Sequence, residues 1–212
     1  MRKTSGFVKA IVVNTEDPEG LGRLQVSISD LKDDPWIERA SFLTGNGYGA
    51  LFTPAVGDEV LVAYEGGGVR RQLFVLGGLW RAASPPPAIA GGQGTIQVLQ
   101  TRGGVSIVID DTPGSESLLL ETPGGRRLLL KDGPAALEIR DGTGTTIRLD
   151  ASGVTIESSA RVTLQASQIN LEASLVDVNA GLAKFDGVVQ CQTLIANSVV
   201  SATYTPGAGN VL

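Results

Sequence analysis

The stretch SIVIDDTPGSESLLLETPGGRRLLLKDGPAALEIRDGTGTTIRLDASGVTIE, residues 106–157, decides the fold class of this chain. Within it, short segments place two apolar residues on either side of one further residue, and a polar turn follows each segment. This period of two is typical of a β-strand that buries one face. The pattern extends from about Thr95 to Phe185, with strand centres at Ile107/Ile109, Leu118/Leu120, Leu128/Leu130, Leu137/Ile139, Ile147/Leu149, Val154/Ile156, Val162/Leu164, Ile169/Leu171 and Val176/Val178.

The spacing of these strand centres shortens along the chain. It begins near ten residues and settles at 7, from 162 to 169 and from 169 to 176. A fixed short period of single strands predicts stacked rungs, as in a β-helix or another solenoid. The early turns are rich in Gly and Pro and the later ones in Ser and Ala, which favours a shaft that narrows towards its C-terminal end. Because each strand is too short to bury its apolar face alone, the partner is either the same chain folded on itself or three chains wound together.

Residues 1–82 differ from this repeat and predict a domain of another kind. Strands are expected at 7–13, 22–28, 59–64 and 73–79, separated by turn signals such as Asp17-Pro18-Glu19-Gly20. About five strands in some 80 residues predict a small closed barrel. The prolines at 85–87 and the glycines at 91–92 predict a stiff spacer that ends in a flexible joint. We therefore expect a barrel at 1–82, a linker at 83–92 and a β-helical spike at 93–212.

The composition agrees with an all-β protein and excludes several classes. The chain has 28 Gly in 212 residues and only 5% aromatic residues, which fits tight turns around narrow cores. The net charge of −5 argues against a general nucleic-acid surface. A single cysteine, Cys191, precludes an intrachain disulfide and is expected to be a small buried hydrophobe. No apolar run is long enough for a membrane span, and the N-terminus does not resemble a signal peptide, so synthesis in the cytoplasm is expected.

The lack of histidine removes the usual enzymatic sites. Without it the chain has no Ser-His-Asp triad and no His-dependent zinc site. A pair of carboxylates, as in a glycosidase, needs only Asp and Glu. The candidates are predicted to be solvated positions on outward faces: Asp110, Asp111, Glu138, Asp141, Asp150, Glu157 and Glu172. We expect no catalytic, cofactor-binding or metal-binding residues.

Three motifs of the first domain have structural interpretations. Pro54-Ala55-Val56-Gly57-Asp58-Glu59 is predicted to be a turn that leads into a strand. Gly45-Asn46-Gly47-Tyr48-Gly49 is not expected to hold phosphate, because no helical pattern follows it. Arg23 is a candidate for an ion pair at a subunit or hub contact. Nucleic-acid binding through stacked aromatic residues is not expected, since several of these are needed to fill the barrel: Phe7, Trp36, Phe42, Tyr48, Phe52, Tyr64, Phe74 and Trp80.

The first domain also carries an ordered set of motifs over residues 6–79. These are Gly6-x-Val8, Asp17-Pro18-x-Gly20-x-Gly22-Arg23-Leu24-x-Val26, Trp36, Gly47-Tyr48-Gly49, Pro54-x-Val56-Gly57-Asp58-Glu59-Val60-Leu61-Val62 and Val75-Leu76-Gly77. The set resembles the OB-fold of the phage baseplate assembly protein V and tail-spike family, which includes type VI secretion spikes and the spikes of other contractile injection systems. The chain departs from the family at Gly66–Arg71, where an acidic loop residue is common, and at Leu73-Phe74-Val75, where a Pro often precedes Val-Leu-Gly.

The resemblance implies a homotrimer at the centre of a baseplate. The OB-fold would dock on a hub formed by another protein, and the β-helix would point at the target envelope. Because no lysozyme-like insert separates the two parts, and the chain has no histidine for an iron-sharpened tip, the end near Leu212 is expected to seat a separate tip protein of the PAAR-repeat kind.

We therefore predict an all-β protein with an N-terminal OB-fold barrel and a trimeric intertwined β-helix. Its function would be that of a non-enzymatic central spike of a phage tail or tail-like particle, which punctures an envelope mechanically. The alternatives are a β-helical polysaccharide-degrading enzyme and an OB-fold nucleic-acid-binding module with a fibrous tail.

Overall fold

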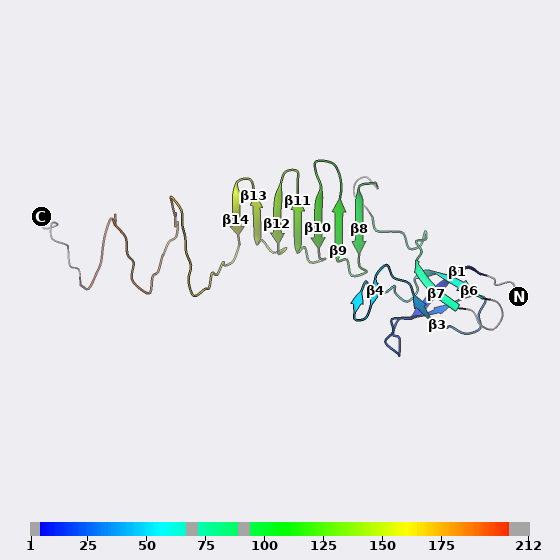
Figure 1. Cartoon of the computed structure of the whole chain (residues 1–212). Coiled ribbons are helices and arrows are strands. Elements are labelled where there is room, and N and C mark those ends of the chain that lie inside the picture. The colour runs from blue at the N-terminus through cyan, green and yellow to red at the C-terminus, as the bar shows by residue number, and fades with distance from the viewer. Residues whose placement is uncertain (1–4, 67–71, 89–93, 204–212) are drawn as a thin grey trace. The chain divides into compact units, whose positions relative to one another are not determined.

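The computed structural model describes residues 5–66, 72–88 and 94–203. In these residues all regular structure is β-strand, and no helix is found that could cross a membrane. The chain divides into two compact units, Met1–Arg161 and Val162–Leu212. The first contains a barrel and a separate sheet, and the expected all-β class is confirmed (Figure 1).

Five strands close the N-terminal barrel in the order β1-β2-β3-β7-β6. The strands are β1 (Ser5–Asn14), β2 (Leu24–Ser27), β3 (Trp36–Arg39), β6 (Glu59–Glu65) and β7 (Gln72–Gly78). All neighbouring pairs are antiparallel except β3 and β7, which run parallel. A five-stranded barrel of this size is the OB-fold architecture, so the predicted barrel is confirmed. The sequence prediction did not contain β3.

The barrel interior is aliphatic. Alternate residues of the strands point inward, as in Val60 and Val62 of β6, both fully buried. The other buried hydrophobic residues are Ala10, Val12, Leu24, Val26, Ile28, Ile37 and Val75. The expectation that aromatic residues fill the barrel was wrong. Trp36 and Tyr64 are half-buried, whereas Phe7, Phe42, Tyr48, Phe52, Phe74 and Trp80 are exposed, because short aliphatic side chains already fill so narrow a barrel.

The turns before β2 and β6 are built around aspartates. Asp17 accepts hydrogen bonds from the backbone N–H groups of Glu19, Leu21 and Arg23 at 2.9–3.1 Å. Asp58 accepts one from the N–H of Ala55 at 2.7 Å, and β6 begins at the next residue. The predicted turn at 54–59 is therefore confirmed. The glycine motif at 45–49 forms a small hairpin of β4 (Thr44–Gly45) and β5 (Tyr48–Gly49), with no helix after it.

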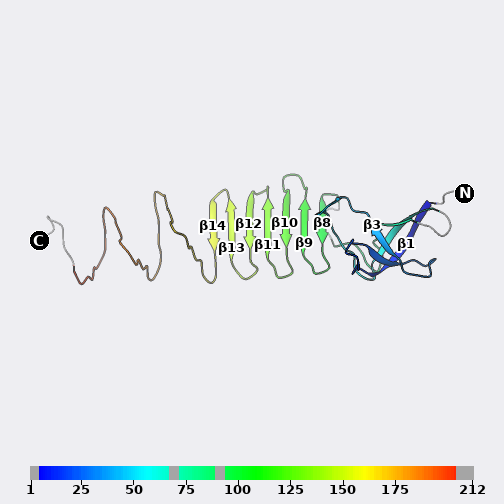
Figure 2. The same cartoon turned by 60° about the horizontal axis from the view of Figure 1, so that its bottom comes forward.

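The second element of the first unit is a seven-stranded antiparallel sheet in simple up-and-down order (Figures 1 and 2). Its strands are β8 (Ile96–Gln100), β9 (Ser106–Asp110), β10 (Ser117–Glu121), β11 (Arg127–Lys131), β12 (Ala136–Arg140), β13 (Thr146–Asp150) and β14 (Gly153–Glu157). Strands β9–β14 were predicted, and β8 was not. Each strand pairs with its sequence neighbours within the chain, whereas an intertwined β-helix would pair strands of different chains. For backbone hydrogen bonds this part of the chain therefore uses its own strands as partners; this pairing does not cover the apolar face of the sheet.

Glycines let the turns of successive hairpins lie against one another. Gly142 has φ +78°, which side chains rarely adopt, and a Cβ there would lie 2.5 Å from the carbonyl oxygen of Gly124. The turns can therefore follow the spacing of the strands, which is about 4.8 Å.

The second unit has a different local structure. Residues 162–203 are extended but form no strand with any described part of their own chain. Side-chain contacts in this segment join residues two positions apart, as in the hydrogen bond from Gln168 to Asn170 and the ion pair of Lys184 with Asp186, both at 2.9 Å. Cys191 is exposed, contrary to expectation, because no described part of the chain covers this segment.

Three predictions fall wholly or partly on residues outside the described ranges. They are the departure from the family pattern at 66–71, the glycine joint at 91–92 and the tip-binding end at 205–212. The division at 1–82, 83–92 and 93–212 stays a prediction.

Candidate assembly surfaces

One face of the β8–β14 sheet carries two straight rows of aliphatic side chains, which we call the assembly face. The first row contains Ile109, Leu118, Leu130, Leu137, Leu149 and Val154, and the second contains Ile107, Leu120, Leu128, Ile139, Ile147 and Ile156. Each residue lies directly opposite the next across the strands. These are the apolar pairs that the sequence predicted to be inward.

Nothing in the described chain covers the assembly face. Every buried hydrophobic residue found belongs to the barrel, while Ile109, Leu130 and Ile139 keep 41, 43 and 45% of their surface exposed. Fully burying one Leu or Ile contributes about 1.5–3 kcal/mol. Covering twelve half-exposed side chains would contribute on the order of 10 kcal/mol per chain, before the cost of association. A groove of about 570 Å³ lies along the second row, lined by Ile107, Leu120, Leu128 and Ile139 among others.

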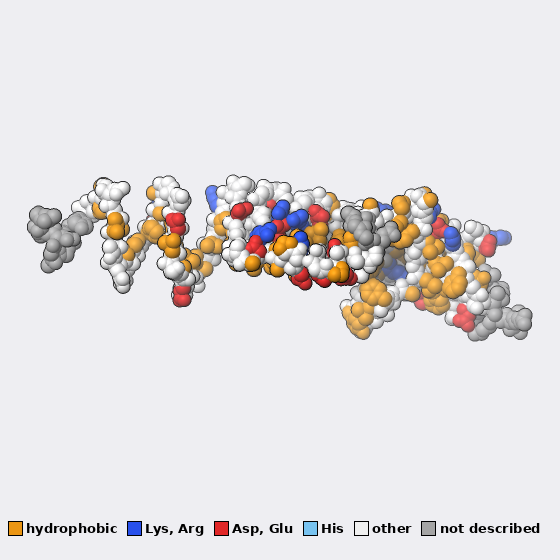
Figure 3. All heavy atoms as spheres, turned by 90° about the horizontal axis from the view of Figure 1, so that it is seen from above, with side chains coloured by type: hydrophobic (Ala, Val, Ile, Leu, Met, Phe, Trp, Pro, Cys, Tyr) orange, Lys and Arg blue, Asp and Glu red, His pale blue; other side chains and the backbone are white. Residues whose placement is uncertain are grey.

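The opposite face carries a cluster of charges centred on Glu138, which we call the Glu138 network. Arg127 donates to Glu138 Oε1 from Nε at 3.1 Å and from Nη2 at 2.5 Å. Arg140 donates to Oε2 from Nη2 at 2.9 Å and approaches Oε1 with Nε at 2.7 Å. Arg148 lies 3.8 Å from Oε2 and also donates from Nε to Asp150 at 2.6 Å. Figure 3 shows the Lys and Arg side chains gathered over this part of the sheet.

The prediction that Glu138 is a solvated outward residue was wrong in one respect. Its side chain does point away from the assembly face, but the arginines cover it and leave the residue only 3% exposed. Hydrogen bonds from Arg127, followed by those from Arg140, lower the pKa of this carboxyl below its usual value in spite of its burial.

The other candidate carboxylates do not form an acid/base pair. Asp110, Asp141 and Asp150 each accept hydrogen bonds from the backbone and hydroxyl groups of the Thr or Ser two residues later, and so hold the turns. These hydrogen bonds lower the pKa of each carboxyl. Asp111, Glu157 and Glu172 are exposed. Among the described residues no group of three or more potential metal ligands was found.

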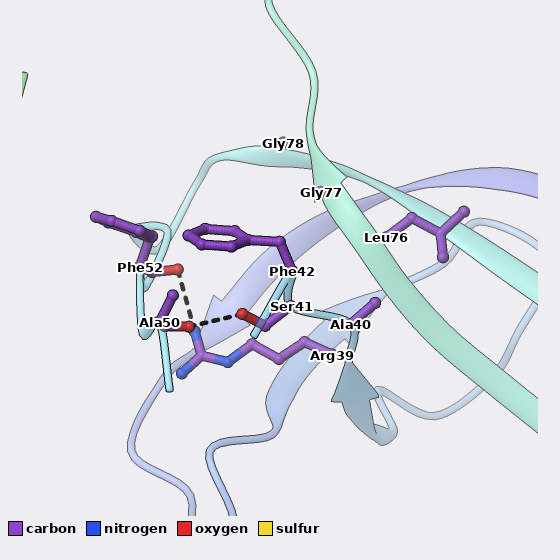
Figure 4. A pocket seen from close by; sticks show the side chains of 9 residues that line it. All are labelled: Arg39, Ala40, Ser41, Phe42, Ala50, Phe52, Leu76, Gly77 and Gly78. Atoms are coloured by element: carbon purple, nitrogen blue, oxygen red, sulfur yellow. Dashed lines mark hydrogen bonds between the residues drawn. The ribbon is translucent and has the colours of Figure 1, made fainter. Parts of the chain in front are cut away.

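The barrel presents a second apolar surface on residues 40–53, which we call the aromatic loop. The rings of Phe42 and Phe52 stack with centroids 6.3 Å apart, yet these residues are 83 and 60% exposed. A cleft of about 490 Å³ lies beside them, and Leu76, Gly77 and Gly78 of β7 also line it (Figure 4). Sequence reasoning did not find this surface, because it assigned such aromatic residues to the core.

Polar contacts hold the aromatic loop in place. Arg39 donates to the carbonyl of Phe52 at 3.3 Å and to Thr53 Oγ1 at 3.1 Å, and Ser41 donates to the carbonyl of Ala50 at 2.7 Å. The first and last of these contacts are visible in Figure 4. These contacts hold the backbone of the loop that carries the two stacked rings, and a loop held in this way loses less freedom when it binds a partner.

Arg23, the candidate for an intersubunit ion pair, is engaged within its own turn. Its Nη2 lies 2.7 Å from Asp17 Oδ1 and 2.9 Å from Glu19 Oε1. Within the chain these contacts close the turn before β2; a contact of Arg23 to another subunit or to a hub stays a prediction.

The extended second unit repeats one environment. Val162 and Leu164 are 53 and 71% exposed, Ile169 and Leu171 are 52 and 72%, and Val176 and Val178 are 54 and 67%. The seven-residue period of the sequence is thus repeated in the exposure of the apolar side chains. These apolar side chains, like those of the assembly face, have no cover within the described chain.

Two family models match the chain. The first is the type VI secretion system and phage-baseplate injector OB domain, at residues 8–80. The second is the phage baseplate V C-terminal trimerisation domain, at residues 117–183, which includes most of the assembly face and the three apolar pairs from Val162 to Val178. A search of curated proteins found no match. The barrel, the uncovered apolar face and these two matches together show that the chain belongs to the phage baseplate V and type VI secretion spike family.

Proposed function

We propose that this protein is the central spike of a contractile phage tail or injection-system baseplate, and that it acts as a homotrimer which punctures an envelope mechanically. The observation that carries the proposal is the pair of aliphatic rows on the assembly face, which no described part of the chain covers. Three copies related by a three-fold axis would bury these rows against one another. The match to a trimerisation domain over the same residues supports this arrangement.

The shaft of such a trimer would have two parts. Over 96–157 each chain contributes a sheet of its own, and three sheets would face the axis. Residues 162–203 pair with no described strand of their own chain, so their backbone groups would pair with the other two chains, as an intertwined β-helix requires. Residues 83–92 would form the linker between the OB domain and this shaft.

The aromatic loop is the surface that we assign to the hub at the OB end. Exposed, rigidly held aromatic residues beside a cleft are typical of the centre of a protein interface. F42D and F52D should abolish co-purification with a hub protein and leave the barrel folded, since both side chains are exposed. F7D is the matched control, because Phe7 is equally exposed but lies outside the loop. Unchanged hub capture by F42D/F52D would refute this assignment.

At the other end we propose a separate tip protein of the PAAR-repeat kind, seated on the last residues of the trimer. The end of a β-helix leaves apolar side chains and backbone groups uncovered, so it needs a cap. Deleting residues 205–212 should remove co-purification with the tip protein. Binding that survives the deletion would place the contact elsewhere.

Native mass spectrometry tests the spike itself. The expected mass is about three times the 21.9 kDa of the chain. The trimer should resist cold SDS, because wound strands must unwind before they separate. A stable folded monomer would refute the spike and favour one of the two alternative functions. A salt-sensitive shift with single-stranded DNA would favour the nucleic-acid-binding module.

A further inference from the structure

The Glu138 network joins three strands. Its carboxylate belongs to β12, while Arg127 comes from β11 and Arg148 from β13. Arg140 adds a contact from β12 itself. Three arginines contact one carboxylate. The network can therefore form only when the three strands have their native register relative to one another.

The aliphatic pattern does not by itself define the alignment of these strands. Strands β9, β10 and β11 have three consecutive apolar residues each, so Val108, Leu119 and Leu129 extend the apolar surface to the side opposite the assembly face. Strict alternation of apolar and polar residues penalises a slip of one residue, and three consecutive apolar residues weaken that penalty. A shift of two residues would keep every side chain on its face and cost little aliphatic contact.

Charge does distinguish the alignments of β12 and β13. Glu138 lies directly opposite Arg148. A shift of two residues would bring it opposite Thr146 or Asp150 instead, exchanging an attractive pair for a neutral or a repulsive one. The native alignment also places Arg127 directly opposite Arg140. Two like charges in that position repel each other unless an anion lies between them, and Glu138 is the anion that bonds to both.

We propose that Glu138 is a positioning residue which sets the register of β11, β12 and β13. The network lies just before the point at which the chain stops pairing with itself, since β14 ends at Glu157 and the unpaired segment follows. The register of these strands therefore determines at which residue the segment 162–203 begins to pair with the other chains. An error of two residues here would displace every apolar repeat of that segment relative to those of the two other chains. This inference rests on the proposed trimer.

A pair of cysteines reports the register directly. Ala136 and Asp150 are opposite each other at the open end of the β12–β13 hairpin, within reach of a disulfide. A shift of two residues would move one of them about 7 Å along its strand and out of reach. The reporter is A136C/D150C in a C191A background, oxidised in the purified full chain. Because D150C removes the contacts of Asp150 with Arg148 and Ser152, this triple variant is the reference for every comparison.

Adding E138Q to this reporter should reduce the yield of the disulfide at least about twofold and the SDS-resistant trimer with it. Hydrogen exchange across residues 127–157 should accelerate at least about tenfold, as expected when the buried anion that bonds Arg127 and Arg140 is removed. Exchange across 106–121 should change little. T155L is the matched control, because Thr155 lies opposite Arg148 in the same row but makes no contact with Glu138.

If E138Q does not fold, R148Q provides a second test. It removes the contact of Arg148 with Glu138, which joins β13 to β12, and leaves the contact of Arg127 from β11 in place. It should lower the disulfide yield and accelerate exchange in β13 and β14 while β11 stays protected. A full disulfide yield and a normal trimer in either variant would overturn the assignment. Failure of the parent chain to form a trimer would overturn the proposed function instead, so the two results are distinct.

Discussion

Asp17 and Arg23 close the turn before β2 through a contact of 2.7 Å between Oδ1 and Nη2, and the side chain of Asp17 is only 3% exposed. The same carboxylate accepts three backbone N–H groups. The carboxylate of Asp17 thus accepts hydrogen bonds from backbone groups along the whole turn, which explains why a turn with glycines at positions 20 and 22 is ordered.

Replacing Asp17 with Asn should therefore destabilise the barrel in a pH-dependent manner. The hydrogen bonds from Arg23 lower the pKa of Asp17 well below its usual range. A lowered pKa in the folded state contributes stability that is present above the unfolded value, about pH 4, and is lost as the pH falls further. Hydrogen exchange in residues 5–28 of D17N should exceed that of the native chain at pH 7, and the difference should shrink below about pH 4. E19Q serves as the control, since Glu19 is largely exposed. A difference that is constant down to pH 2 would contradict this explanation.

In the second unit, L164D or L171D should prevent assembly. Each change would place three unpaired charges, one per chain, in the apolar centre of the shaft. An unpaired buried charge destabilises the assembly by about 3–5 kcal/mol. Q165D should do little, because Gln165 follows inward Leu164 directly and successive side chains of a strand point to opposite faces. Native mass spectrometry gives the oligomeric state of each variant. Equal effects at Leu164 and Gln165 would show that the assumed strand phase is wrong.

Gly142 should be harder to replace than Gly114, which also lies in a hairpin turn. In G142A the added Cβ meets the carbonyl of Gly124 at 2.5 Å and the backbone must keep a φ of +78°. In G114A only the strained φ remains, because nothing lies within 4 Å of the added atom. We expect a loss of about 1 kcal/mol for G114A and clearly more for G142A, measured as the change in exchange of the adjoining hairpins. Equal losses would mean that the turns do not pack against each other.

The full chain should not degrade cell-wall polymers. Of the carboxylates considered, Asp110, Asp141 and Asp150 already hold turns and Glu138 is bonded to arginines. Incubation with purified peptidoglycan should release neither sugars nor peptides. Release that disappears on replacing one of these carboxylates would make the protein an enzyme.

The sequence predicted most strands because their apolar residues alternate, as in Ile147 and Leu149. It missed β8, where Gln97 replaces an aliphatic residue on the assembly face, and β3, which is short and buries only Ile37. It placed Glu138 in solvent because much of the cover comes from Arg127 and Arg148, 11 and 10 positions away on the two neighbouring strands. A linear pattern does not contain such cross-strand contacts. The division of the shaft could have been inferred in part. The glycine turns up to residue 153 permit hairpins within one chain, whereas the seven-residue repeats beyond 162 lack them.

The order of pairing in the β8–β14 sheet has a consequence for load. Its strands stand side by side along the ladder, so the backbone hydrogen bonds that join them run along the direction in which the ladder advances (Figure 2). A pulling force applied to β8 and β14 would detach one strand at a time, because the backbone hydrogen bonds between only two neighbouring strands would resist it at any moment. Compression along the same direction presses all the rows together at once. Such a sheet resists compression along the ladder better than tension, which suits a part that is pushed.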